Sequence, residues 1–422
     1  SVGPGISPPR VHRPKERAIS AARPRSRKAT PQPPSALSTG TISKRYSSIS
    51  PLSQATHPRA AEAARRAPAS AQTVTRLTVL HRSIPFFTYP CLEDIMPDPR
   101  PRVVISRCIE FAACRYNGAM VKSDTVLRLM PYVEFLPVCM EADMGLGIPR
   151  DPVRIVRKDG ADRLVQPSTG RDLTDTALRF TREHLANLSD VDGFLLKGRS
   201  PSCGIKDVRV YPPGEGKAVL TGRSSGMFAR EVLNAFPDLA IEDETRLLNG
   251  RIADHFLTRI FTHARFRGCL ERGTPKALMD FHARHKLLLM GYNQSAMRRL
   301  GRISASSAPL EERLQQYSMD LHQALRRPPN CRSWNNAMMH AMGYFSGKLE
   351  PQEKQHFLRS LEWFVEGKVP LSAPLLMLRS WALRYEEEYL LQQVLFEPYP
   401  AEFMGLLGTD ACSGRDLWEV AR

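Results

Sequence analysis

Cysteine is the residue type whose placement in this chain most clearly suggests chemistry. The apolar runs VVIS, FLPV and GFLL lead to Cys108, Cys139 and Cys203 respectively, and Cys114 lies six residues after Cys108. If these runs are neighbouring parallel strands, their carboxyl ends meet at one edge of a sheet, where ligands bind in open α/β folds. The four thiols would then converge on one site.

Converging thiolates are soft ligands that suit zinc or an iron–sulfur cluster. The stretch SPSCG around Cys203 favours the cluster, because it offers hydroxyls, a glycine that permits close approach, and backbone N–H groups that can bond to sulfide. The spacing alone does not decide, because C-x5-C matches neither a CxxC zinc knuckle nor a ferredoxin run. The alternative for any one cysteine is a buried, inert thiol.

The elements that would position these cysteines follow from the pattern of apolar residues. Short apolar runs alternate with helical patterns from Pro101 onward, which predicts an α/β domain with a mostly parallel sheet. Asp172 is the expected N-cap of one of its helices. The expected strands are Arg102–Ser106, Val133–Val138 and Asp192–Gly198, with a hairpin around Asp159-Gly160. The expected helices are in DTVLRLMPYV and over Asp172–Leu188, Gly226–Phe236 and Glu244–His263.

From about Arg265 onward the sequence predicts helices only, and therefore a second, all-α domain. Pro275 suits the first turn of the first helix. Gly347 and Gly367 are typical stop signals. The helical stretches are TPKALMDFHARHKLLLMGYNQ, LEERLQQYSMDLHQALRR, NNAMMHAMGYFSGKL, PQEKQHFLRSLEWFVEGK and APLLMLRSWALRYEEEYLLQQVL.

Residues 1–95 differ from the rest of the chain in composition. They are rich in Pro, Ser, Ala and Arg, and they carry +11 of the net charge of +17. Such a composition predicts disorder, but it also suits an organelle transit peptide or a translated leader ahead of Met96. The remainder is only mildly basic, which permits a nucleic-acid partner without requiring one.

The composition also bears on the compartment. No apolar run approaches the roughly 18 residues that span a bilayer, so we expect no membrane segment and a soluble protein. The eight cysteines are sparse for 422 residues, which favours a reducing compartment over a disulfide scaffold. We therefore expect a cytoplasmic protein, or a mitochondrial one if the N-terminal segment is a transit peptide.

Several motifs, in order, give the chain a family resemblance. ISRCIEFAACRYNG, LPVCMEADMGLGIPR, STGRDLTDTALRF and DGFLLKGRSPSCGIKDVRVY, followed by LAIEDETRLLN, resemble the thiouracil desulfidase (TudS-like) family over about Arg102 to Arg265. The stretch from about Thr274 to Pro400 resembles the YbgA-like domain often fused to it. The fused arrangement is similar to bacterial enzymes that remove sulfur from thiouridine in tRNA. The implied division is a tail over residues 1–98, an iron–sulfur desulfidase domain over 99–266, an all-helical domain over 267–405 and a tail over 406–422.

The resemblance implies a [4Fe–4S] cluster held by only three cysteines. By motif these are Cys108, Cys114 and Cys203. One iron would then lack a protein ligand and offer an open Lewis-acid position to a soft thiocarbonyl sulfur. Electron withdrawal from C=S would let water attack the carbon, with loss of hydrosulfide. Cys139 falls in a family motif but is not among the implied ligands, so it would contact the ligands rather than the cluster.

Glu141 and Ser200 are the catalytic residues that the resemblance implies. Glu141 could act as acid and base if apolar walls raise its pKa, or it could be an ordinary carboxylate at a helix start. Ser200 would help to hold the substrate or the leaving sulfur, or its hydroxyl could bond to its own backbone. Lys197 and Arg199, in the same motif, could contact phosphate or be solvated.

Three residues depart from the family pattern. Glu110 and Phe111 stand where the family commonly has apolar residues and glycine, and Met140 replaces the usual proline before the acidic residue. These positions lie close to the expected substrate pocket. They leave cluster binding intact, but they leave open which substrate is used and whether the ancestral activity persists.

A basic stretch, residues 265–302, suggests a macromolecular partner. It could grip the phosphates of a structured RNA, or it could be a solvated face. The basic residues are Arg265, Arg267, Arg272, Lys276, Arg284, Lys286, Arg298, Arg299 and Arg302, with Phe266, Phe281 and Tyr292 between them and only Glu271 and Asp280 opposing them.

The predicted function is that of a cluster-dependent desulfidase. It would replace thiocarbonyl sulfur by oxygen in a thiolated pyrimidine, either tRNA thiouridine or free thiouracil, and release hydrosulfide. One alternative is a non-catalytic RNA-binding protein with a structural metal site. Another is a different lyase or hydrolase that uses the same open iron. The sequence leaves the oligomeric state open.

Overall fold

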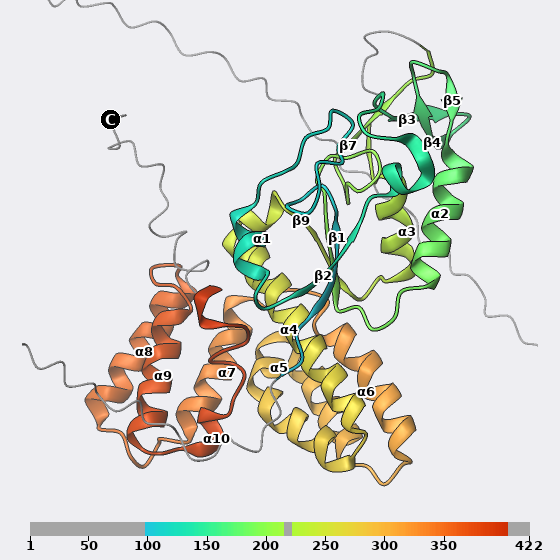
Figure 1. The fold of residues 1–422 in the computed structure, drawn as a ribbon. Helices are drawn as coiled ribbons and strands as arrows, with labels where there is room; N and C mark the ends of the chain where they lie inside the picture. The colour runs from blue at the N-terminus through green and yellow to red at the C-terminus, as the bar shows by residue number, and fades with distance from the viewer. Residues whose placement is uncertain (1–97, 215–221, 404–422) are drawn as a thin grey trace, which may run out of the picture. The chain divides into compact units, whose positions relative to one another are not determined.

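The computed structural model describes residues 98–214 and 222–403, which Figure 1 draws in colour. Within this part of the chain, strands and helices alternate first and helices alone follow, as predicted. The expectations for residues 1–95 and 406–422 lie outside the described residues.

A four-stranded parallel sheet forms the centre of the α/β part. Three of its strands are the ones predicted from apolar runs, whereas β9 is not among the predicted strands. Parallel strands covered on both faces read as continuous apolar runs, and Val103, Val104 and Ile105 are all fully buried. The strand order is β2 (Glu134–Val138), β1 (Arg102–Ser106), β6 (Gly193–Leu196), β9 (Ala240–Asp243).

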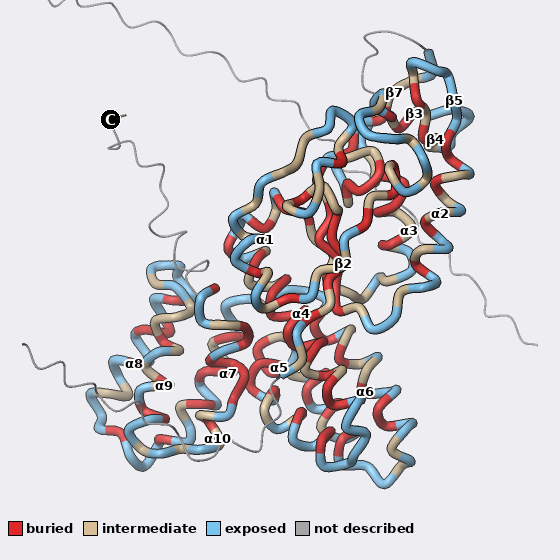
Figure 2. The backbone as a smooth tube through the Cα atoms, viewed as in Figure 1, coloured by how far each residue is buried: buried red, intermediate tan, exposed pale blue. Residues whose placement is uncertain are grey.

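Alternate residues of β1 enter two different cores, one on each face of the sheet. Val104 packs with Phe194 against α2 and α3, whereas Val103 and Ile105 pack against α1 and α4. Figure 2 shows the buried strands between these helices. The sheet is therefore fixed from both sides, and so are the ends of its strands. The helices are α1 (Asp124–Leu129), α2 (Thr174–Ala186), α3 (Met227–Ala235) and α4 (Gly250–Arg272).

A second, mixed sheet of five short strands lies in the same part of the chain. The predicted hairpin at Asp159-Gly160 joins β3 and β4, and both of these residues have positive φ, 51° and 77°, as such a turn requires. The other three strands were not predicted, since each has only two to four residues. The strand order is β5 (Arg171–Asp172), β4 (Ala161–Gln166), β3 (Arg154–Lys158), β7 (Val208–Tyr211), β8 (Gly222–Ser224).

Two predicted helix starts need correction. Asp172 belongs to β5, and its carboxylate accepts from the Thr174 N–H at 2.9 Å, so the residue at the N-cap of α2 is Leu173. The helix predicted from Glu244 begins later, after a 3₁₀ turn (Arg246–Leu248), because the Asn249 side chain caps α4 by accepting from Ile252.

The helical part contains the predicted helices with different ends. Pro275 opens α5 as predicted, with Thr274 as the N-cap. Asn293 leaves the helical conformation (φ −159°, ψ 99°) and kinks α5. The final predicted helix is interrupted near Glu386, which has φ 50°. The helices are α5 (Pro275–Ser304), α6 (Leu310–Ala324), α7 (Cys331–Gly343), α8 (Pro351–Val365), α9 (Ser372–Arg384) and α10 (Glu388–Leu391), followed by a 3₁₀ turn (Ala401–Phe403).

The long helix α4 belongs to both parts of the structure. Phe256 and Ile260 join the core of the parallel sheet, and Phe266 and Cys269 join the core of the helical part. The proposed domain boundary at residue 266 therefore falls inside a continuous helix. Among the described helices, none is both long and apolar enough to cross a bilayer.

Candidate active site

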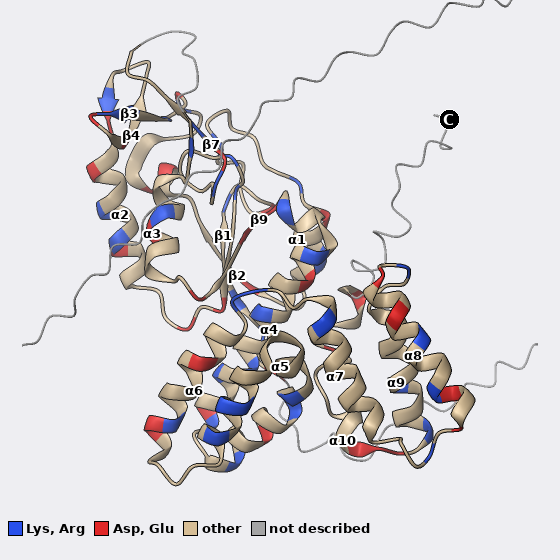
Figure 3. Cartoon of the chain, turned by 180° about the vertical axis from the view of Figure 1, so that it is seen from behind, with Lys and Arg blue, Asp and Glu red and all other residues tan. Residues whose placement is uncertain are grey.

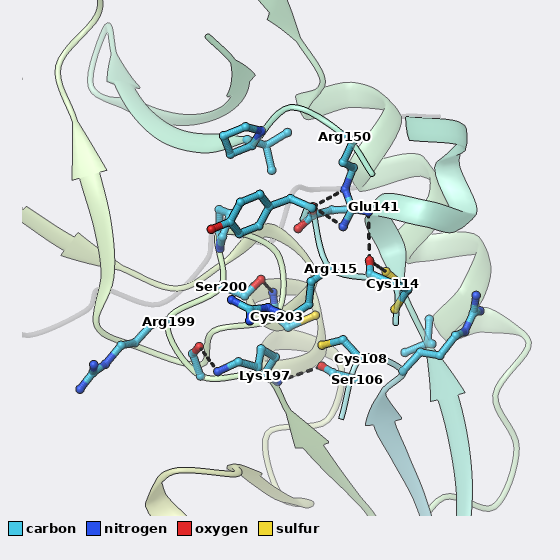
Figure 4. Close-up of a pocket in the computed structure, with 18 of the residues that line it drawn as sticks. Ser106, Cys108, Cys114, Arg115, Glu141, Arg150, Lys197, Arg199, Ser200 and Cys203 are labelled. Carbon is cyan, nitrogen blue, oxygen red and sulfur yellow. Dashed lines mark hydrogen bonds and ion pairs between the residues drawn. The ribbon is translucent and has the colours of Figure 1, made fainter. Parts of the chain in front are cut away.

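The carboxyl ends of β1, β2 and β6 open into one pocket of about 380 Å³. Every residue that the sequence nominated for the site lines it (Figure 4). The convergence follows from the sheet, because β1 lies between β2 and β6 and all three run in the same direction. These residues are Cys108, Cys114, Cys139, Glu141, Ser200 and Cys203.

A compact loop after β1 positions the first two cysteines. The Cys108 carbonyl accepts from the Val121 N–H at 2.7 Å, and the Cys114 N–H donates to the Ala112 carbonyl at 2.8 Å. The thiol of Cys139, which follows β2, reaches the Cys114 carbonyl at 3.9 Å. The two loops thus bring Cys114 and Cys139 into contact, and Cys108 lies on the same wall of the pocket.

The loop after β6 is built around Ser200. Its Oγ accepts from the N–H groups of Ser202 and Cys203, each at 3.2 Å, and its carbonyl accepts from the Gly204 N–H at 2.9 Å. The backbone N–H groups of Ser202 and Cys203 are therefore used within the loop, contrary to the expectation that they are free to bond to sulfide. Ser200 adopts the backbone-bonding role that the sequence left as an alternative, and it still faces the pocket.

The N-terminus of α3 holds this loop from behind. Met227 and Ala229 donate their N–H groups to the carbonyls of Pro201 and Ser202, at 3.0 and 3.1 Å. Gly226 packs so closely that a Cβ there would clash with the Ser202 carbonyl. The position of Cys203 is consequently fixed by a helix start as well as by its own turn.

The thiols of Cys114 and Cys203 are buried, those of Cys108 and Cys139 are half-buried, and the four influence one another. Burial, followed by the neighbouring Cys139 thiol, raises the pKa of Cys108 to about 11 and that of Cys114 to about 12. Burial also raises the pKa of Cys203 well above its ordinary value, which a hydrogen bond with Ser106 partly offsets. Without a bound cation these groups are thiols at neutral pH, so metal binding would release protons.

Glu141 is oriented by two residues that the sequence did not nominate. Arg150 donates to its Oε2 from Nε at 2.9 Å and from Nη2 at 2.7 Å, and Ser202 donates to its Oε1 at 2.6 Å. Arg150 Nη1 also donates to the Cys114 carbonyl at 3.0 Å. Both residues lie inside the family motifs, as the last residue of GLGIPR and the second serine of SPSC, but no local pattern shows that they meet Glu141.

The three departures from the family pattern do not line the pocket. The Glu110 carboxylate, whose side chain is almost fully buried, bonds to the Ser123 N–H and pairs with Lys122. Phe111 packs edge-on against Phe135, with ring centroids 5.7 Å apart. Met140 is buried in the core behind the pocket. None of the three therefore contributes to the wall of the pocket.

Two cationic side chains at the rim of the pocket, Lys197 and Arg199, differ in whether the protein itself supplies a hydrogen-bond or ion-pair partner. Lys197 is tied to the Glu244 carboxylate and to the Gly198 carbonyl. Within the described residues Arg199 has no hydrogen-bond or ion-pair partner, and its side chain extends away from the thiols (Figure 4). Arg199 is therefore available to a ligand, whereas Lys197 is held in place.

Two family models match the chain. The one described as 2-thiouracil desulfurase matches residues 103–244. The one described as Protein of unknown function (DUF1722) matches residues 286–400. The first match contains all six of the nominated residues, and the second lies within the helical part.

Two curated proteins and one solved structure are similar to parts of the chain. The uncharacterized protein YbgA of Escherichia coli (strain K12) is 31% identical over 154 residues, which are 36% of this chain and 91% of that protein. The uncharacterized protein YbbK of Bacillus subtilis (strain 168) is 28% identical over 109 residues, or 24% of this chain and 72% of that protein. A solved structure, described as a [4Fe-4S]-dependent thiouracil desulfidase TudS, is 25% identical over 35% of this chain and 93% of its own, with a TM-score of 0.28.

Proposed function

Because the chain belongs to the YbgA family and carries a 2-thiouracil desulfurase domain ahead of its helical region, we propose that it is a [4Fe–4S]-dependent desulfidase acting on a thiolated pyrimidine. One observation carries the proposal. Thiols from separate loops surround one pocket beside an oriented carboxylate.

The donor set fits an iron–sulfur cluster, because cysteine thiolates are the ligands of such clusters and these thiols line one pocket. Within residues 98–214 and 222–403, no three His, Cys, Asp or Glu side chains are grouped to hold a single metal ion. Cys108, Cys114 and Cys203 would hold the cluster, and Cys139, which contacts the Cys114 carbonyl, would support that ligand. Three ligands would leave one iron open to the substrate.

When bound, such a cluster would supply a soft Lewis acid that draws electrons from a thiocarbonyl group. The chain's own residues would handle the water and its protons. Glu141 would accept a proton from water at its carboxylate, and Arg150 and Ser202 would hold that carboxylate in place. The oxygen of water stays on the carbon, and its two hydrogens leave with sulfur as hydrosulfide and a proton. The reaction therefore needs neither oxidant nor reductant.

The pyrimidine could be free or part of a tRNA, and the helical part bears on this choice. Of the basic residues in 265–302, Arg265 is paired with Asp98 and Arg267 with Asp192, so neither is available to RNA. Phe266 and Phe281 are core residues rather than surface aromatics. The proposed RNA-binding face is therefore reduced to the exposed cations. These are Arg272, Lys276, Lys286, Arg298, Arg299 and Arg302, with Lys276 and Arg299 each paired to an aspartate.

Anaerobic purification followed by an activity assay tests the proposal. We expect a brown protein with broad absorbance near about 400 nm that converts 2-thiouracil or thiouridine in tRNA to the oxygen analogue, with one sulfide released per turnover. Cys203→Ala should lose both colour and activity. A colourless, zinc-containing protein that binds RNA without changing it would contradict the proposal and favour a structural metal site.

A further inference from the structure

A row of arginines crosses the mixed sheet beside the cysteine pocket. In the register of β7 and β8, Arg209 lies directly opposite Arg223. On the other side of β7, Ile155 of β3 pairs with Val210, which puts Arg154 next to Arg209. The three arginines therefore come from three adjacent strands at the same level of the sheet, and Arg209 shares a face of β7 with Tyr211. Figure 3 colours Lys and Arg blue along the chain, including stretches beside the labels of β3 and β7.

This row is poorly neutralised by the protein itself. Two like charges directly opposite each other across a strand pair destabilise a sheet. Arg223 donates to the Asp207 backbone carbonyl at 3.3 Å, but its ion pair with the Asp207 carboxylate is long, at 3.9 Å, and exposed. Arg154 lies over the Tyr211 ring at 5.1 Å. In the described part of the chain, Arg209 has no side-chain partner. A bound anion would remove the repulsion.

The row lines a groove that continues from the cysteine pocket. The groove measures about 510 Å³, and among the described residues that line it Asp207 is the one acidic residue. Arg199, which has no partner in the described structure, stands where the two cavities join. The residues common to both cavities are Tyr116, Pro152, Val153, Arg199 and Pro201.

We infer that this groove is a phosphate-binding subsite for an RNA strand whose thiolated base enters the cysteine pocket. Guanidinium groups bind phosphate through paired, charge-assisted hydrogen bonds. Three adjacent strands extend over about 10 Å, which is wider than one phosphate group and suits consecutive phosphates of a strand. The exposed ring of Tyr116, between the two cavities, offers a surface on which a neighbouring base can stack. The identity of the base rests on the proposed function, but the phosphate contacts do not.

The double variant Arg209→Ala/Arg223→Ala tests the subsite by binding alone. The probe is a fluorescein-labelled, non-thiolated single-stranded RNA of roughly 12 nucleotides, and the readout is fluorescence anisotropy at several salt concentrations. We expect a loss of affinity of about 10-fold or more. The slope of log K against log salt concentration should also become shallower by about 1.4, because two phosphate contacts are lost. Arg163→Ala, on β4 of the same sheet and outside the groove, should bind like the wild type.

Two further measurements separate a loss of phosphate contacts from a loss of folding. The single variants Arg209→Ala and Arg223→Ala each remove one of two opposed arginines, so the melting temperature should be unchanged or higher. Arg199→Ala lies outside the sheet and should weaken RNA binding without altering the strands. In the activity assay, the double variant should raise KM about 10-fold for a thiouridine-containing oligonucleotide and leave KM for the free nucleoside unchanged. Binding is measured without turnover, so the groove is tested even if the protein lacks desulfidase activity.

Three results would overturn the inference. The first is wild-type RNA affinity in the double variant. The second is an equal loss of affinity in Arg163→Ala. The third is displacement of the labelled RNA by uridine monophosphate as effectively as by unlabelled RNA, because the groove would then hold a single phosphate rather than a strand.

Discussion

Glu141 faces the cysteine pocket with both carboxylate oxygens already engaged. Arg150 and Ser202 approach it from different loops, and Arg150 also holds the Cys114 carbonyl. A single guanidinium therefore links the carboxylate to a proposed cluster ligand. This arrangement suits a group that must accept a proton at a defined place next to a bound substrate.

Replacing Glu141 by Gln should separate proton transfer from cluster binding. Gln has nearly the same shape but cannot accept a proton, so we expect turnover to fall by about 10²- to 10⁴-fold while the visible spectrum is retained. Steady-state kinetics and absorbance of the same anaerobic sample measure both properties. Arg150→Lys is the matched variant, and it should reduce turnover while leaving the acid intact. Wild-type turnover in Glu141→Gln would remove this residue from the mechanism.

The four cysteines should fall into two classes on substitution. A proposed ligand is removed in each of Cys108→Ala, Cys114→Ala and Cys203→Ala. We therefore expect these variants to lose the absorbance at about 400 nm and the bound iron. Cys139→Ala removes a thiol that contacts the Cys114 carbonyl, and we expect the iron content to be largely retained. Iron and sulfide analysis of the four variants checks this division. Loss of iron in Cys139→Ala would show that Cys139 is a fourth ligand, and no iron would then be left open to the substrate.

Sequence patterns predicted the pocket residues that follow the strands, but not the residues that hydrogen-bond to Glu141. Each of Cys108, Cys139 and Cys203 follows an apolar run, and parallel strands bring the starts of the loops that carry them to one edge of the sheet. The contacts of Arg150 and Ser202 with Glu141 join residues 9 and 61 positions apart. No periodicity encodes such contacts, because they depend on how the loops pack.

At the scale of elements, the start of α3 fixes the loop that carries Cys203. Gly226 allows the helix N-terminus to approach the backbone of Pro201 and Ser202 closely enough to hydrogen-bond with it. The strands β1, β2 and β6 could be predicted because each contains a run of apolar residues, namely VVI, FLPV and GFLL. The hairpin of β7 and β8 could not, because β8 is the polar stretch GRS and β7 alternates buried and exposed residues over only four positions.

Gly226→Ala should therefore displace the loop that carries Cys203, although Gly226 itself does not line the pocket. The added methyl group would meet the Ser202 carbonyl, so the loop or the helix must move, at a cost of about 1–3 kcal/mol. We expect weaker iron retention and lower activity, measured as iron content after gel filtration and as thiouracil turnover. Gly343→Ala, near the end of α7, has open space around it and should leave both unchanged. Full iron retention in Gly226→Ala would show that the loop does not depend on α3.

At the scale of the whole molecule, α4 joins the core of the parallel sheet to the core of the helical part. Asp254 lies on this helix and accepts from the Tyr399 hydroxyl at 2.8 Å. It also borders a cavity of about 360 Å³ in the helical part. Burial raises the pKa of Asp254 to about 6, and the hydrogen bond from Tyr399 partly opposes that rise. A carboxyl group that favours its neutral form in the folded state links global stability to pH.

The sign of this effect is opposite to that of a paired surface carboxylate. Between pH about 4 and 6 the unfolded chain releases the Asp254 proton while the folded chain keeps it, so the free energy of unfolding should fall as pH rises through this window and then level off. A shift of about two pKa units corresponds to roughly 3 kcal/mol, and contact with the cavity should reduce this to about 1–2 kcal/mol. Asp254→Asn keeps an acceptor for Tyr399 and should lose the dependence, so its stability relative to wild type should increase from pH 4 to 6.5. Tyr399→Phe removes the opposing hydrogen bond and should move the transition to higher pH.

Urea unfolding of the three proteins at half-unit pH intervals measures these differences. Parallel wild-type and Asp254→Asn curves would show that the pKa of Asp254 is the same in the folded and unfolded states.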